Sequence, residues 1–242
     1  MMGKVMMSGV APNMKAPISG ILASELAVGS VVKLMEDGVA TEYLVVNQGK
    51  PSGSSLYDDS CDGLWLLRND IKVKRQWHSS KSEIYKDSDI NSYLNGTFFN
   101  LFDTDTQSII KQVKIPYVNG TAKSEVASGD NGLSSKIFLL SGYEVGFTQS
   151  INSNFPIDGA KLDFFISGNA STANAKRIAK LNGGATTWWL RSPNSTSYAW
   201  SVETSGGCNG AYCTTSFGIR PALVLPSNAL FDTNTLILKG VA

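Results

Sequence analysis

Two apolar segments near the C-terminus enclose a stretch of small, neutral residues, and this contrast constrains the fold most. The sequences TTWWLRSP and FGIRPALVLP flank residues 194–216, which read NSTSYAWSVETSGGCNGAYCTTS. All of these except Trp200, Val202 and Glu203 are Asn, Ser, Thr, Tyr, Ala, Gly or Cys. Tyrosine offers contact area at low entropic cost, and the small polar residues offer adaptable hydrogen bonding, as in antibody binding loops. The pattern indicates a ligand surface held on a rigid frame, with an ordinary loop between strands as the alternative.

The rest of the chain predicts an α+β domain with mostly antiparallel sheets, two or three short helices and long loops. Asp37-Gly38 separates two apolar runs and is typical of a β-hairpin. Ser88 or Asp89 can cap a helix that starts after them. Strands are expected at residues 31–35, 42–47, 64–68, 114–117, 137–140, 186–191, 198–203, 219–225 and 235–239, and helices at 89–98, 103–113 and 171–181.

The length and composition favour one domain with a short extension. Residues 1–29 are rich in Met, Gly, Ala and Pro and predict an arm or attachment segment, with plain disorder as the alternative. Residues 30–242 form the expected ligand-binding domain, with a variable region at about residues 188–220. The first residues lack the apolar stretch of a signal peptide, and no run long enough for a transmembrane helix occurs. We therefore expect synthesis in the cytosol and no membrane insertion.

Charge and the scarcity of reactive side chains argue against nucleic-acid binding, metal binding and catalysis. The formal net charge is +1 and Lys and Arg do not cluster, so no nucleic-acid partner is expected. The single histidine, His78, lies far in sequence from any candidate nucleophile. The three cysteines make no Cys-x-x-Cys pair of the kind that binds zinc. We expect a protein that is not an enzyme and binds no metal or cofactor.

The two flanking segments resemble a bacterial and phage family of unknown function. That family has W-L-R-S-P and G-[I/V]-R-P-A-L at the ends of a variable stretch, and here Trp189–Pro193 and Gly218–Leu223 match them. Residues 93–99, 137–141 and 144–145 look like the same family. Its members are similar to the variable proteins of diversity-generating retroelements, which have a C-type-lectin-like fold. Those elements rewrite adenines, and adenine replacement in Asn codons yields the residue types found at 194–216.

The resemblance implies a receptor-recognition protein, or adhesin, at a phage tail tip or, alternatively, on a bacterial surface. It would be assembled in the host cytoplasm and end in the virion tail. The expected partners are a host-cell surface protein or glycan and, through residues 1–29, other virion tail proteins; a homotrimer would suit a tail. The variable contact residues are expected in loops, at Asn194, Ser195, Thr196, Ser197, Tyr198, Cys208, Asn209, Ala211, Tyr212, Cys213 and Thr214. The expected framework residues are Trp188, Arg191, Trp200, Gly218 and Arg220.

Several alternatives remain open at this point. Formylglycine-generating enzymes share a variant of the fold and use two cysteines near the C-terminus, a role that Cys208 and Cys213 could take. The protein could also be a passive virion component. Arg191 and Arg220 could bind an acidic ligand, although an unpaired charge inside an apolar strand is costly. Adjacent strand residues face opposite ways, so Trp188 and Trp189 must contact different layers.

Overall fold

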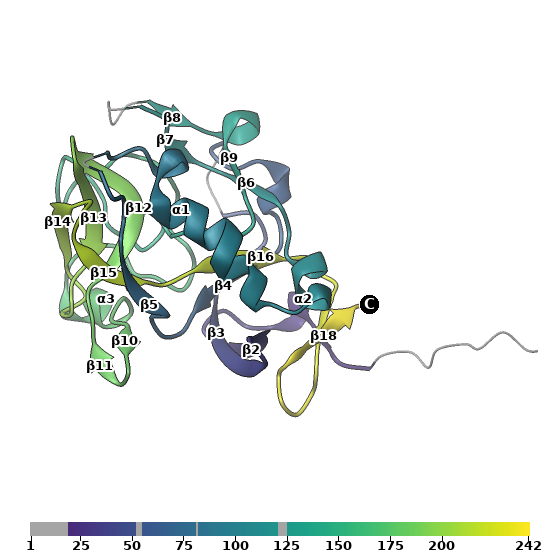
Figure 1. Cartoon of the computed structure of the whole chain (residues 1–242). Helices are drawn as coiled ribbons and strands as arrows, with labels where there is room; N and C mark the ends of the chain where they lie inside the picture. Colours follow the sequence, from purple (N-terminus) through teal and green to yellow (C-terminus); the bar gives the residue numbers. More distant parts are fainter. Residues whose placement is uncertain (1–18, 52–54, 81, 121–124) are drawn as a thin grey trace, which may run out of the picture.

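The computed structural model describes residues 19–51, 55–80, 82–120 and 125–242. Within these ranges the strands form three larger sheets and three two-stranded pairs, and the helices are short (Figure 1). Nearly all strand pairs are antiparallel, and one is parallel. The α+β architecture with mostly antiparallel sheets is therefore confirmed. None of the described helices is long and apolar enough to cross a bilayer.

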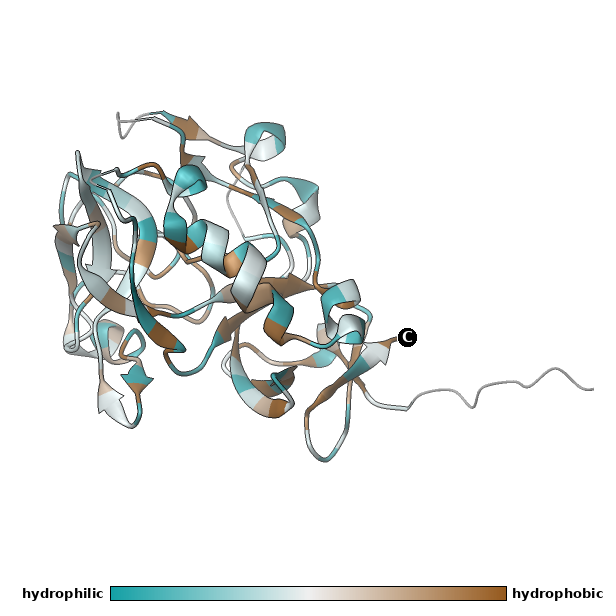
Figure 2. Ribbon diagram, viewed as in Figure 1, coloured by the Kyte–Doolittle hydropathy of each residue, from teal (hydrophilic) through white to brown (hydrophobic). Residues whose placement is uncertain are grey.

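A four-stranded sheet at the centre of the molecule separates two hydrophobic cores. Its strands lie in the order β16 (Ala222–Leu225), β4 (Leu64–Arg68), β3 (Val39–Gln48) and β2 (Val31–Glu36). Along β4, Leu64 and Leu66 contact one core, whereas Trp65 and Leu67 contact the other. Both faces of the sheet are thus buried, which accounts for the continuous apolar runs seen as brown ribbon along β16 in Figure 2. The expected hairpin between β2 and β3 is confirmed, with positive φ at Asp37 and Gly38.

A five-stranded sheet, at the left of Figure 1, carries the neutral segment. Its order is β14 (Cys208–Tyr212), β13 (Tyr198–Val202), β12 (Trp188–Ser195), β15 (Ser216–Ile219) and β5 (Val73–Gln76). β12 runs parallel to β15, where Trp188 pairs with Gly218. Trp189 joins the first core while Trp188 joins the second, so the two tryptophans face different layers as predicted.

The remaining strands pair at the periphery. Three of them form a sheet of β1 (Ile21–Leu22), β17 (Ala229–Phe231) and β18 (Leu238–Val241). The two-stranded pairs are β6 (Val113–Ile115) with β9 (Leu133–Ser135), β7 (Tyr117–Val118) with β8 (Val126–Ala127), and β10 (Lys180–Leu181) with β11 (Gly184–Ala185).

The helices begin where the sequence predicts but are shorter. α1 (Asp89–Tyr93) is capped by Ser88 and continues as a π-helical turn, η4 (Leu94–Phe98). α2 (Thr104–Ile109) is capped by Asp103, and α3 comprises Ser171–Ala175. Five 3₁₀ turns complete the described helices, at η1 (Ala23–Glu25), η2 (Asp59–Cys61), η3 (Tyr85–Asp87), η5 (Phe99–Leu101) and η6 (Gly129–Asn131).

Several expected elements differ from the structure. The strand expected at 235–239 lies instead at Leu238–Val241, and the one expected at 114–117 is divided between β6 and β7. The helix expected to reach residue 181 ends at Ala175, because Arg177 turns inward and donates to buried carbonyl groups. Residues 137–140 are buried but form no strand, since only Phe138 pairs, with Ala222. The strand expected at 219–225 is divided at Arg220-Pro221, where the chain passes from one sheet to the next.

The N-terminal boundary expected at residue 29 is wrong. β1 pairs with β17, and Ala23 and Leu26 are buried in the first core. Residues 19–29 are therefore part of the domain, because their apolar side chains close the core against the C-terminal hairpin. The rest of the expected arm, residues 1–18, lies outside the described residues.

Candidate functional site

The expected contact residues lie on the β12–β13–β14 meander rather than in loops. Tyr198 pairs with Tyr212, Trp200 with Gly210, and Val202 with Cys208. The loop prediction is wrong for seven residues that lie within these strands: Asn194, Ser195, Tyr198, Cys208, Asn209, Ala211 and Tyr212. Thr196 and Ser197 form the turn after β12, and Thr214 follows β14. The backbone hydrogen bonds of a meander do not depend on side chains, so this surface has a rigid base.

Ten of the eleven expected contact residues are at least partly accessible, and one is not. Ser195, Thr196, Asn209 and Tyr212 are exposed, with Tyr212 at 47%. Cys213 is fully buried in the first core, and its carbonyl oxygen accepts hydrogen bonds from the backbone of Trp77 and His78. The prediction that Cys213 contacts a ligand is therefore wrong, because its side chain packs inward next to β5.

Aromatic side chains support the outer end of the meander from one face. Tyr198, Trp200 and Val202 share a face of β13, since alternate strand residues point the same way. The rings of Tyr198 and Tyr212 lie 4.1 Å apart between centroids. Trp200 stacks on Phe155 with a centroid distance of 4.1 Å and an interplanar angle of 19°. Trp200 is 3% exposed, which confirms its predicted place in the frame.

A hollow of about 490 Å³ opens on this face of the meander. Its walls are mainly amide and aromatic side chains, from Asn152, Asn169, Asn194, Asn209, Tyr198 and Trp200. Ser195, Cys208, Gly210 and Ile151 complete the lining. No charged side chain lines it, so the hollow presents neutral hydrogen-bonding groups beside aromatic rings.

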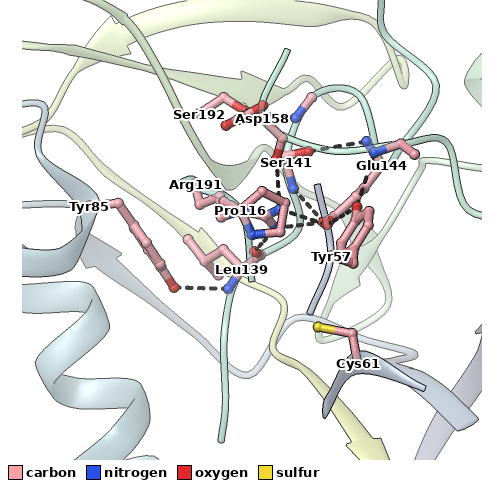
Figure 3. Close-up of polar contacts among 12 residues, drawn as sticks. Tyr57, Cys61, Tyr85, Pro116, Leu139, Ser141, Glu144, Asp158, Arg191 and Ser192 are labelled. Carbon is pink, nitrogen blue, oxygen red and sulfur yellow. Dashed lines mark hydrogen bonds and ion pairs between the residues drawn. The ribbon is translucent and has the colours of Figure 1, made fainter. Parts of the chain in front are cut away.

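Arg191 anchors β12 through a buried network (Figure 3). Its guanidinium binds the carboxylate of Glu144 in a bidentate pair, at 2.5 and 2.6 Å. The remaining N–H groups donate to the carbonyl oxygens of Pro116, Leu139 and Asp158, each at 2.9 Å. All five donors of the guanidinium are satisfied, which removes the cost of an unpaired buried charge.

The carboxylates in this network extend the anchor to neighbouring segments. Glu144 also accepts hydrogen bonds from the Tyr57 hydroxyl at 2.7 Å and from the backbone N–H of Ser141 at 2.9 Å. Ser192, next to Arg191, donates to both carboxylate oxygens of Asp158, at 2.8 and 3.0 Å. Segments distant in sequence thus converge on the strand that leads into the neutral segment.

Burial and charge shift the titration of this network in opposite directions. Burial raises the pKa of Asp158 to about 7, although Arg191 and the Ser192 hydroxyl partly oppose the shift. Burial lowers the pKa of Arg191, but the Glu144 and Asp158 carboxylates outweigh it, so the pKa lies above its ordinary value. Arg191 therefore stays charged, whereas Asp158 changes charge near neutral pH.

Arg220 and Gly218 have the expected framework roles. Arg220 is 2% exposed, donates from Nε to the carbonyl oxygen of Arg68 at 2.9 Å and lies over the ring of Trp188. Burial lowers its pKa to about 10. Because Arg191 and Arg220 are both buried, neither presents its charge to an external acidic ligand. A Cβ at Gly218 would lie 2.7 Å from Cγ2 of Ile71, so glycine is required for the close packing of β15.

Sequence reasoning missed the partners of the buried arginines. Glu144 and Asp158 are fully buried, and Glu144 stands in the apolar stretch LLSGYEVGF. A carboxylate in such a stretch requires a partner, which is the signal that could have identified it. Arg177 is also buried, with its guanidinium 4.0 Å from the ring centroid of Phe147 and bonded to several carbonyl groups. No comparable sequence signal marks Arg177, since it follows a short polar helix.

The cysteines and the histidine are not arranged for catalysis. Four residue steps along β14 separate Cys208 from Tyr212, which is about 13 Å, and Cys213 lies one residue further. Burial raises the pKa of Cys213 to about 12 and also raises that of Cys208, which opposes formation of a reactive thiolate. His78 Nδ1 lies 3.4 Å from an oxygen of Asp89 at the start of α1. Among the described residues, no three His, Cys, Asp or Glu side chains gather as metal ligands would.

Comparison with known proteins places this domain in a family. Residues 62–227, more than half of the chain, match the family described as a domain of unknown function, DUF6273. The chain belongs to this family. The DUF6273 match contains both flanking motifs, the whole meander and the buried network except Tyr57. It leaves out β2, β3 and the β1–β17–β18 sheet. No curated protein and no solved structure matches the chain, so the resemblance to a C-type-lectin-like fold stays a prediction.

Proposed function

We propose that this DUF6273 domain is a ligand-recognition module, not an enzyme, and that its contact surface is the outer part of the β12–β13–β14 meander. The observation that carries the proposal is the contrast within this segment. Accessible positions hold small polar residues and tyrosine, whereas buried positions such as Trp188, Arg191 and Val202 hold the frame. Such a surface can change its side chains without loss of the core.

We further propose that the surface is diversified by a retroelement and that it recognises a host-cell surface molecule. The residue types at 194–214 support this, because all of them except Trp200 and Glu203 are among those that adenine replacement in Asn codons yields. The C-type-lectin-like fold remains part of this proposal. The protein would act at a phage tail tip, in a trimer attached through its N-terminal residues, or on a bacterial surface.

Two matched libraries of the full chain test the proposal. In the first, the accessible positions Ser195, Thr196, Asn209 and Tyr212 are changed to the residue types that adenine replacement in Asn codons yields. In the second, the same residue types are introduced at the buried positions Trp188, Leu190, Ala199 and Val202. We expect first-library members to keep the melting temperature of the parent protein. We expect them to differ in the bacterial strains to whose cells they bind. We expect second-library members to unfold at lower temperature.

Two results would count against this function. If accessible and buried substitutions lower the melting temperature equally, the meander is not a replaceable surface. If folded members of the first library bind no strain, or all bind as the parent does, a passive structural role replaces the recognition role. Because the surface holds few charges, we also expect retention to change little between low and physiological salt.

A further inference from the structure

The hollow on the meander is lined by Trp200, whose indole N–H lacks a hydrogen-bond partner within the described ranges. The indole N–H groups of the other four tryptophans donate to carbonyl oxygens, those of Cys61, Leu190, Arg177 and Arg75, at 2.9 to 3.0 Å. The indole N–H of Trp200 is buried and has no partner among the described residues. A buried donor without an acceptor destabilises the protein, so a ligand that supplies an acceptor gains binding energy there.

Amide side chains line the same hollow as Trp200. The side-chain amides of Asn169 and Asn194 make no hydrogen bond to other described residues, so they are available to a ligand. Asn194 lies directly over Gly210, where a Cβ would come within 2.5 Å of the Asn194 amide nitrogen. Asn209 is oriented by a hydrogen bond from its amide nitrogen to Glu203, at 3.2 Å. Each free amide offers both donors and an acceptor side by side.

The lining excludes several ligand classes. No Lys, Arg, Asp or Glu lines the hollow, so it lacks the charged side chains that favour anions such as phosphate or divalent cations. An apolar ligand would leave the amides and the indole N–H unpaired. The hollow of about 490 Å³ lies within the range typical of small-molecule sites, roughly 300–1,000 Å³. A compact, neutral and polyhydroxylated ligand fits these conditions.

We propose that this hollow binds a terminal neutral pyranose of a cell-surface glycan, in the absence of calcium. Adjacent hydroxyl groups on the ring match the paired donors and acceptors of Asn169 and Asn194. The ring C–H groups carry partial positive charge and pack against the ring of Tyr198, which is partly exposed at the hollow. The Trp200 indole N–H is buried, so a ring or hydroxyl oxygen accepts from it only after a small shift of the side chains that cover it. The inference rests on the proposed recognition function and names the ligand class of that surface.

Nuclear magnetic resonance of the full chain, labelled with ¹⁵N, tests the inference. The probes are methyl glycosides of glucose, galactose, mannose and N-acetylglucosamine, added to the millimolar range in the presence of EDTA. We expect at least one glycoside to shift the indole signal of Trp200 saturably while the other four indole signals stay in place. The variant Trp200→Phe assigns that signal and keeps the stack on Phe155.

Three variants and one control identify the site. Asn194→Ala and Trp200→Phe each remove a proposed donor, and Gly210→Ala displaces the Asn194 amide without removing it. We expect each to weaken the apparent affinity for the glycoside by about tenfold, the effect of one lost hydrogen bond. Asn131→Ala, at an exposed asparagine outside the hollow, should bind as the parent does.

The outcomes separate this inference from the function on which it rests. Saturable shifts whose apparent affinity falls about tenfold in all three variants, followed on backbone amide signals in Trp200→Phe, support the sugar site. Glycoside binding that survives all three variants overturns it, because the site then lies elsewhere. If no glycoside binds but the chain still binds cells until they are treated with protease, the ligand is a protein and only this inference fails. If the chain binds neither glycosides nor cells, the proposed recognition function fails as well.

Discussion

Tyr198 and Tyr212 face each other across β13 and β14 with their ring centroids 4.1 Å apart, although neither belongs to the two hydrophobic cores. Cross-strand aromatic pairs stabilise a sheet modestly, whereas accessible tyrosines contribute strongly to binding. The pair therefore combines a minor role in the fold with a prominent place on the candidate surface.

We expect Tyr212→Ala and Tyr198→Ala to reduce binding to cells and to leave the fold intact. The melting temperature should fall by no more than about 4 °C, the shift that 1 kcal/mol produces in a domain of this size. Trp188→Ala is the matched control, because it removes a fully buried ring and should cost about 3–5 kcal/mol. Calorimetry measures the melting temperature, and sedimentation of the protein with cells measures binding. A large drop in melting temperature for either tyrosine variant would show that the pair is structural.

The ion pair between Arg191 and Glu144 should be needed for folding. Arg191→Met leaves the Glu144 carboxylate buried without a counter-charge and frees three carbonyl oxygens. Loss of one partner of a buried pair costs about 3–5 kcal/mol, which urea unfolding can measure. Lys50→Met breaks an exposed pair with Asp59 and should leave the urea midpoint unchanged. Equal effects of the two variants would contradict the anchoring role of Arg191.

Two glycines with nearly the same positive φ should differ in their tolerance of alanine. Gly206 and Gly183 have φ of 83° and 82°, a region that costs other residues about 1–2 kcal/mol. A Cβ at Gly206 would lie 2.0 Å from the carbonyl oxygen of Asn174, whereas nothing lies within 4 Å at Gly183. Gly206→Ala must therefore shift the backbone that accepts the Arg177 Nε hydrogen bond. Urea unfolding should show the larger loss for Gly206→Ala, and equal losses would mean that the local backbone relaxes freely.

Local signals in the sequence were enough to predict much of the fold. The apolar run at Leu64–Arg68 is β4 as expected, and Asp37-Gly38 forms the hairpin turn. Ser88 caps α1 as predicted, through its hydroxyl oxygen and the backbone N–H of Asn91. Each of these features depends on residues close together in the chain, which is why periodicity and turn chemistry detect them.

The features that escaped prediction depend on contacts between distant residues. β14 has the sequence CNGAY, with little strand propensity, and exists because it completes the sheet beside β13. Glu144 and Asp158 lie 47 and 33 residues from Arg191, so nothing local reveals that they converge. Cys213 shares the composition of the neutral segment, but its position next to β5 buries it. Composition predicted the candidate contact surface, whereas packing decided which of its residues reach solvent.

Asp158 should make the stability of the domain fall as pH rises through the weakly acidic range. Its pKa is raised by burial to about 7 in the folded protein, against about 3.9 in an unfolded chain. Between these values the folded state keeps a proton that the unfolded state has released. The free energy of unfolding therefore decreases with pH in this window, by at most about 1.4 kcal/mol per unit, and the effect levels off above pH 7.

The variant Asp158→Asn isolates this contribution, because it keeps a neutral group that can accept the Ser192 hydrogen bond. Urea unfolding at several pH values between about 4 and 8 gives the free energy of unfolding of each protein. The value for the parent minus the value for Asp158→Asn should decrease as pH rises. Asp59→Asn makes the same change of charge at an exposed carboxylate and should retain the slope of the parent. If Asp158→Asn and the parent change in parallel with pH, then Asp158 is ionised throughout the range. The buried network would in that case hold two carboxylates against the single guanidinium of Arg191.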